Sequence, residues 1–176
     1  MQKRYTTHNL LSKGVYTEAT RNLIHLLVKA GCSRGYVGEV IHAVLKSAGI
    51  TAVGNISRTT VSRIITEGYY AAQIQLAHEM QNAESMTFSA DGTCHRNVNY
   101  NACHINLKAE SYESNNGADG KCHVTCFFCI YSALDATSEQ AMKDWDRCLG
   151  NIVDIYNCSP FGKRTGNFQH TMDILK

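Results

Sequence analysis

The sequence is poor in proline, in charged residues and in long apolar runs. It has one proline and 18% charged residues among 176, and no apolar stretch approaches the length of a membrane span. Its first residues, MQKRYTTHNLLSKG, contain no apolar segment of the kind found in secretory signals. Repeats and low-complexity tracts are also missing. These absences argue against a membrane, secreted or repeat protein, and we expect an intracellular globular chain of one domain or two small ones.

Charge is divided unevenly along the chain. Residues 1–80 hold nine Lys and Arg against four Asp and Glu, whereas residues 81–176 hold eight against eleven, so the net charges are +5 and −3. A basic front half can approach a polyanion, and an acidic back half is repelled by one unless metal ions intervene. The asymmetry predicts two units with different partners.

The front half has the apolar spacing of helices. In the first predicted helix we expect the core face to carry Ala19, Leu23, Leu26, Leu27 and Ala30. Serines cap the second and third helices at positions 33 and 57, and Gly68 ends or bends the third. The predicted helices cover residues 17–30, 33–48, 57–68 and 69–83. They form one helical unit, residues 17–84, after an arm of residues 1–16.

The back half changes to the spacing of strands. Apolar and polar residues alternate in 86–91 and 102–109, and residues 122–134 are apolar on both faces, which is typical of a central strand. Thr137 and Gln140 form a capping box for a following helix. The predicted fold class is therefore α+β, with a β-β-β-α unit whose sheet has an unpaired edge.

This β-β-β-α unit covers residues 85–160, and its helix runs to about Asn157. Pro160 lies just past that point, where a helix cannot continue. Residues 161–176 are left as a C-terminal tail with a short apolar part. We expect the chain to stop before this second unit is complete.

Eight cysteines in a chain without secretory features are more typical of thiols or metal ligands than of disulfides. Three of them begin Cys-His pairs, at residues 94, 103 and 122. Adjacent residues of a strand point to opposite faces, so such a pair serves one zinc ion poorly. We expect Cys122 and Cys126 to share a face with Val124, Phe128 and Ile130, with Cys129 on the other. Core packing is favoured over zinc, over an iron–sulfur cluster and over a Cys/His nucleophile.

The third predicted helix, Ser57-Arg-Thr-Thr-Val-Ser-Arg63, resembles the recognition helix of helix-turn-helix domains in resolvases and transposases. Arginines and short hydroxyl side chains at a helix start can reach phosphates and base edges in the major groove. The candidate DNA-binding residues are Arg58, Thr59, Thr60, Ser62 and Arg63. About eight residues join the second and third helices, rather than the usual three or four. The alternative is a solvated polar face on a small bundle.

Asp91 ends the first predicted strand in the run TFSADGTCHRNVNY. The order β-β-β-α resembles the opening of ribonuclease H-like polynucleotidyl transferases, in which the first strand carries a metal-binding Asp. That resemblance implies a catalytic Asp91 that binds Mg²⁺ weakly, because two-metal chemistry needs several carboxylates from separate elements. The alternative is a turn in which Asp91 accepts hydrogen bonds from its own backbone.

Most of residues 20–160 is similar to the N-terminal part of a family of transposon-derived basidiomycete proteins. The matching runs are VKAGCSRGYVGEVIHAVLK, ISRTTVSRIITEG, SADGTCHRNVNYNACHINLK, SALDATSEQAMKDW and DIYNCSP. The resemblance implies the fold and a transposon origin: a helix-turn-helix-like unit joined to an incomplete ribonuclease H-like unit. We expect the protein to be nuclear.

We therefore expect a DNA-binding protein that does not cut DNA alone. Two alternatives stay open: a Mg²⁺-dependent nuclease or transposase completed by another chain, and a structural module that binds a second protein, or its own copy, through the open sheet edge.

Overall fold

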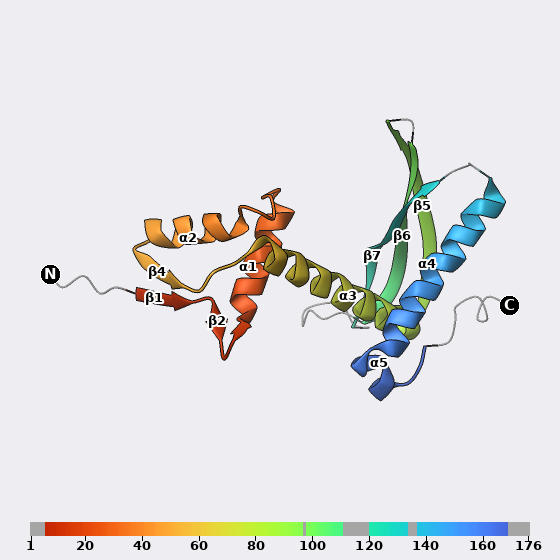
Figure 1. Ribbon diagram of the computed structural model, residues 1–176. Coiled ribbons are helices and arrows are strands. Elements are labelled where there is room, and N and C mark those ends of the chain that lie inside the picture. The colour runs from red at the N-terminus through yellow and green to blue at the C-terminus, as the bar shows by residue number, and fades with distance from the viewer. Residues whose placement is uncertain (1–5, 97, 111–119, 134–136, 169–176) are drawn as a thin grey trace. The chain divides into compact units, whose positions relative to one another are not determined.

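The long helix α3, Arg58–Asn82, contributes to both compact units of the chain, residues 1–69 and residues 70–176 (Figure 1). The computed structural model describes residues 6–96, 98–110, 120–133 and 137–168, so parts of the predicted arm and tail lie outside the described residues. Each unit combines helices with strands. The predicted α+β class is confirmed, while the division between the units falls inside α3 rather than after it.

The front unit contains four short strands that the sequence analysis did not predict. Strand β1 (Thr6–Asn9) pairs in parallel with β4 (Ile50–Val53), and β2 (Leu11–Ser12) forms a hairpin with β3 (Val15–Tyr16). The hairpin turns at Lys13 and Gly14, whose φ angles of 52° and 80° suit a tight two-residue turn. The expectation of a purely helical front half is therefore wrong. These strands are very short, and the β1–β4 pair joins distant segments, so they left no periodic signal.

Helix α1 (Glu18–Lys29) lies where it was predicted but buries a different face. Thr20 and Ile24 are buried, and the hydroxyl of Thr20 donates to the carbonyl oxygen of Leu10 at 3.1 Å. Leu26, which we expected in the core, is 62% exposed. The contact with the N-terminal segment thus sets the rotation of α1.

Helix α2 (Val37–Ser47) begins later than predicted. Ser33 lies in the preceding turn, where its carbonyl accepts from Tyr36 N at 2.9 Å, and no side chain caps the helix. The front core is formed by Leu10, Ile24, Val37, Ile41, Ile56, Val61 and Ile64.

The two helices predicted at residues 57–68 and 69–83 are the single helix α3. Gly68 does not end it, because its backbone φ is not positive and the ring of His25 lies directly against it. A Cβ at residue 68 would overlap that ring. The glycine therefore serves close packing of α1 on α3 rather than helix termination.

In the back unit, β5 (Ser85–His95), β6 (Val98–Glu110) and β7 (Lys121–Ala133) form an antiparallel sheet in the order β5-β6-β7. Helix α4 (Ser138–Cys158) and the second part of α3 cover one face. Helix α5 (Pro160–Thr165) follows a cap at Ser159, whose hydroxyl accepts from Gly162 N at 2.9 Å. The core includes Leu76, Ala77, Met80, Cys103, Ile105, Leu107, Phe128, Leu149, Ile152 and Tyr156.

The position of β7 corrects the prediction of a central strand, since β6 is central and β7 is an edge. A bulge explains its double-sided apolar pattern. Cys129 pairs with Cys103 and Phe127 with His104, so Phe128 has no partner in β6. The extra residue brings Cys129 onto the covered face with Cys126 and turns Ile130 outward, which reverses the predicted sides of both.

Helix α4 begins as predicted, with the Thr137 hydroxyl accepting from Gln140 N at 3.3 Å. The apolar spacing of this helix predicts a core stripe of Met142, Trp145, Leu149, Ile152 and Tyr156. All of these except Met142 lie in or against the core, while Met142 is 65% exposed and Asp144 is buried. Trp145 stacks on Phe128 with ring centroids 5.5 Å apart. Among the residues described, no helix combines the length and apolar character that a membrane crossing requires.

Candidate nucleic-acid interface

The first turn of α3 is fixed by a side-chain cap. Ser57 Oγ accepts from Thr60 N at 3.2 Å and lies 3.1 Å from the Thr60 hydroxyl, and Val61 N donates to the Ser57 carbonyl at 3.0 Å. No acidic residue lies in this turn. A helix N-terminus carries a partial positive charge from its backbone N–H groups, so this end of α3 favours an anion.

Buried residues on either side of the cap hold this turn against the front core. Val61 and Ile64 are 0% and 3% exposed, and Ile56, just before the cap, is 6% exposed. Gly38, in the first turn of α2, lies so close to Ile56 that an added Cβ would overlap the Ile56 carbonyl oxygen. The beginnings of α2 and α3 therefore lie side by side.

The five predicted DNA-binding residues are not equally available. Arg58, Thr59 and Arg63 are exposed, whereas Thr60 and Ser62 are half-buried. The Thr60 hydroxyl is engaged with Ser57, and the Ser62 carbonyl accepts from the Thr66 hydroxyl at 3.0 Å. Positions four residues apart share a helix face, so the outward surface consists of Arg58, Thr59 and Arg63.

Neither arginine of this surface makes an ion pair with any residue in the described part of the chain. By contrast, Arg21 of the same unit is paired with Glu67. Arg58 and Arg63 thus keep their guanidinium donors for a ligand, and a guanidinium suits the bidentate binding of phosphate.

Arg34 is a further exposed arginine of the front unit, outside the predicted DNA-binding residues. It is exposed in the turn before α2, and the first turn of α2 touches the residue that precedes the α3 cap. We infer that Arg34 lies at the same end of the front unit as Arg58. In the sequence, Gly38 was the sign that the beginnings of α2 and α3 meet, because a glycine within an apolar helix often marks a close approach of two backbones.

The difference in net charge between the two parts of the chain is larger when the chain is divided at residue 69. Residues 1–69 hold nine Lys and Arg against three Asp and Glu, a net charge of +6, whereas residues 70–176 hold eight against twelve, a net charge of −4. Of the front acids, Glu67 is neutralised by Arg21. The front unit therefore attracts a polyanion more strongly than the chain's overall +2 indicates.

Asp91 lies inside a strand and not in a turn. It pairs with Ala102 in the β5–β6 ladder, which continues to His95 opposite Val98, so the proposed turn at Asp91 and Gly92 is wrong. Ala102 alternates with the buried Cys103, and residues directly opposite each other share a face. Asp91 is therefore exposed on the face opposite α4.

Asp91 belongs to no metal-binding cluster among the described residues. The described residues contain no group of three or more His, Cys, Asp or Glu side chains that could hold a metal ion. Asp144, the buried acid of α4, is instead bonded to Arg147 at 2.8 Å and to Gln140 at 3.2 Å. The described chain thus does not assemble the several carboxylates that two-metal catalysis requires.

The cysteines of the sheet are mainly part of the core. Cys103 is fully buried, Cys126 and Cys129 pack against the same core, and burial raises the pKa of all three thiols. A raised pKa keeps these thiols protonated, as suits small apolar residues of a core. Cys94 and Cys158, by contrast, are exposed.

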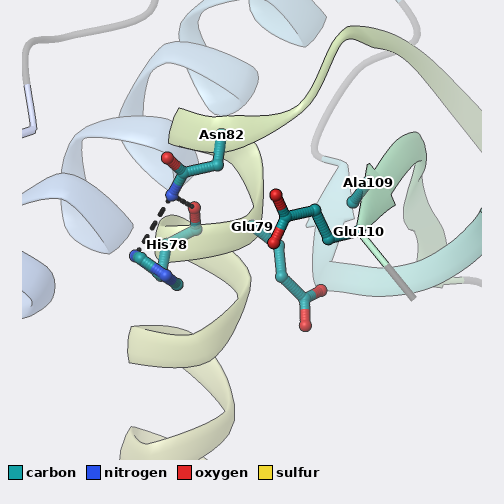
Figure 2. A pocket seen from close by; sticks show the side chains of 5 residues that line it. All are labelled: His78, Glu79, Asn82, Ala109 and Glu110. Atoms are coloured by element: carbon teal, nitrogen blue, oxygen red, sulfur yellow. Dashed lines mark hydrogen bonds between the residues drawn. The ribbon is translucent and has the colours of Figure 1, made fainter. Parts of the chain in front are cut away.

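A small hollow in the back unit is lined by residues outside the predicted sites (Figure 2). It has a volume of about 150 Å³ and is lined by His78, Glu79, Asn82, Ala109 and Glu110. Asn82 Nδ2 donates to the His78 carbonyl at 2.7 Å and lies 3.2 Å from His78 Nδ1. Two carboxylates line this hollow, so it does not suit phosphate. The basic end of the front unit remains the candidate site for nucleic acid.

No family model, no curated protein and no solved structure matches the chain.

Proposed function

We propose that this protein binds double-stranded DNA through the beginning of α3, with Arg58, Thr59 and Arg63 as the contacting residues and Arg34 beside them. The observation that carries the proposal is the pair of exposed arginines without ion-pair partners in the described chain, next to a capped helix N-terminus. The net charge of +6 on residues 1–69 draws a duplex toward the front unit.

We prefer DNA over other polyanions because the candidate surface is the beginning of a helix. A helix start fits the major groove, where arginine bonds guanine and a threonine side chain reaches base edges or the thymine methyl group. The resemblance of Ser57–Arg63 to the recognition helix of helix-turn-helix domains supports the same ligand, and a DNA ligand favours a nuclear location. Strand cleavage by this chain alone is not part of the proposal, since Asp91 lacks converging carboxylates among the described residues.

The direct test is titration of a labelled duplex with the purified chain, followed by fluorescence anisotropy. The double substitution Arg58→Ala with Arg63→Ala removes the two guanidinium groups without touching the buried Val61 and Ile64. We expect it to weaken binding by roughly 1–3 kcal/mol for each arginine that bonds a base edge.

The matched control is Lys163→Ala with Arg164→Ala, which removes two exposed positive charges from α5 in the back unit. We expect this control to bind DNA nearly as tightly as the wild type. Equal losses of affinity in the two double variants would mean that only total charge matters, and unchanged affinity in the first would place the interface elsewhere.

A further inference from the structure

Most of the large exposed apolar side chains of the sheet lie on one edge strand; the exception is Val98 of β6. Val124, Phe127 and Ile130 of β7 are 39%, 56% and 58% exposed. The opposite edge strand, β5, presents Ser85, Thr87, Ser89, Asp91 and Thr93 on its open face. In the described sheet no strand pairs with the free side of β7. An edge strand leaves every second backbone N–H and C=O unpaired, and this edge adds apolar surface to them.

This edge also lacks most of the features that prevent edge strands from pairing with other chains, namely charged residues and proline. Residues 124–133, VTCFFCIYSA, contain no charged residue and no proline, and Lys121 lies at the far beginning of the strand. The remaining feature is the bulge at Phe128. A bulge obstructs a straight strand, but it is compatible with a partner that bends at the same place.

We propose that a second copy of this chain pairs with β7, antiparallel and about a two-fold axis that passes between Phe128 and Cys129. In this register Phe127 of each copy lies opposite Ile130 of the other. Cys126 then lies opposite Tyr131, Thr125 opposite Ser132, and Val124 opposite Ala133. Two three-stranded sheets become one six-stranded sheet, with a closed and self-complementary interface.

The faces of the strand single out this register. Phe127 and Ile130 both belong to the open face, because their partners in β6 are His104 and Ala102. Cys126 and Tyr131 both belong to the covered face, opposite Ile105 and Asn101. A shift by one residue would place open-face side chains against covered-face ones. The bulge lies at the axis, so the faces match on both sides of it.

The symmetry of the face pattern about Phe128 and Cys129 favours a copy of the same chain as the partner, and charge does not oppose the pairing. The paired stretch ends at Val124 and Ala133, so Lys121 and His123 stay outside it and no like charges meet. Its open face brings two Phe127–Ile130 pairs together, and aromatic side chains opposite β-branched ones stabilise antiparallel strands. This association does not depend on DNA binding.

Sedimentation of the full chain over a range of concentrations tests the proposal. We expect a monomer–dimer equilibrium that Ile130→Lys or Phe127→Lys weakens by roughly 10- to 100-fold, because each substitution acts twice about the axis. Ser89→Lys is the matched control, since it adds the same charge to the same face on β5. A wild type that stays monomeric, a dimer that Ile130→Lys leaves intact, or an equal weakening in the control would overturn the proposal.

A charge pair tests the register. Combining Phe127→Lys with Ile130→Glu places Lys opposite Glu twice across the axis, and we expect it to recover association that each single substitution weakens. A combined variant no better than the single ones would overturn the arrangement.

Hydrogen exchange of the backbone amides in the wild type tests the dimer without any substitution, so a variant that fails to fold does not affect the result. We expect the backbone amides of residues 124–133 to gain protection with rising concentration while those of β5 do not. Exchange that does not depend on concentration would contradict the proposal.

Discussion

At Gly38 the backbone of α2 passes the carbonyl of Ile56, one residue before the cap of α3. Gly38→Ala would place a methyl group against backbone that cannot move aside like the end of a flexible side chain. We expect it to lower the free energy of unfolding by about 1–3 kcal/mol, measured by urea denaturation. Gly35→Ala is the control, because nothing lies within 4 Å of its added Cβ. Equal stability of the two variants would contradict the close approach of α2 and α3.

The buried thiol of Cys103 gives stability a specific pH dependence. Burial raises its pKa in the folded chain above its pKa in the unfolded chain. Above the unfolded pKa the unfolded chain loses the proton while the folded chain keeps it, so the stability present at neutral pH is lost as pH rises. We expect Cys103→Ala to make the fall in unfolding free energy between neutral pH and about pH 9.5 shallower. The exposed Cys158→Ala should follow the wild type, and identical slopes in all three proteins would contradict this assignment.

Individual burial was the least predictable feature from sequence. Leu26 and Met142 matched apolar stripes but are exposed, whereas Asp144 is buried with Arg147 and Gln140 as partners. Helical spacing identifies candidate faces, but the neighbouring elements decide which face is covered. In α1 the covered face includes Thr20, which bonds Leu10, and in α4 it includes Trp145, which stacks on Phe128.

Substitutions of Ser57, the cap of α3, can change the stability of the helix and its affinity for DNA separately. Ser57→Ala removes the acceptor for Thr60 N and should cost about 1 kcal/mol of stability. Ser57→Asp keeps a capping oxygen and should retain stability, but it puts a negative charge where we place the phosphate. We expect Ser57→Asp to unfold like the wild type and to bind duplex DNA more weakly. An aspartate variant with unchanged affinity would show that phosphates do not approach this turn.

Long elements with a clear local signal were predictable, and elements that depend on distant partners were not. The alternation in β5 and β6 and the Thr137 cap of α4 correctly indicated strand and helix. The strands β1 and β4 could not be predicted, because each is four residues long and pairs with a segment far along the chain. Gly68 was interpreted as a helix end because its contact with His25 cannot be read from local sequence.

For the whole molecule, binding without cutting is the expected behaviour. Supercoiled DNA incubated with the chain and excess Mg²⁺ or Mn²⁺ should stay intact, because the described residues gather no carboxylate cluster around Asp91. Gel electrophoresis measures nicking, and Asp91→Ala is the control. Nicking that requires a metal ion and disappears in Asp91→Ala would reveal a complete site and make the protein a nuclease.

The salt dependence of DNA affinity tests the central claim most directly. Each phosphate contact contributes about 0.9 to the slope of log affinity against log salt concentration for duplex DNA. If the beginning of α3 binds the phosphate backbone, the wild type should lose affinity steeply with salt, and Arg58→Ala with Arg63→Ala should make the slope shallower by roughly 1–2. A duplex affinity that does not change with salt, or slopes that are identical in the wild type and the double variant, would contradict a DNA-binding site at this end of the front unit.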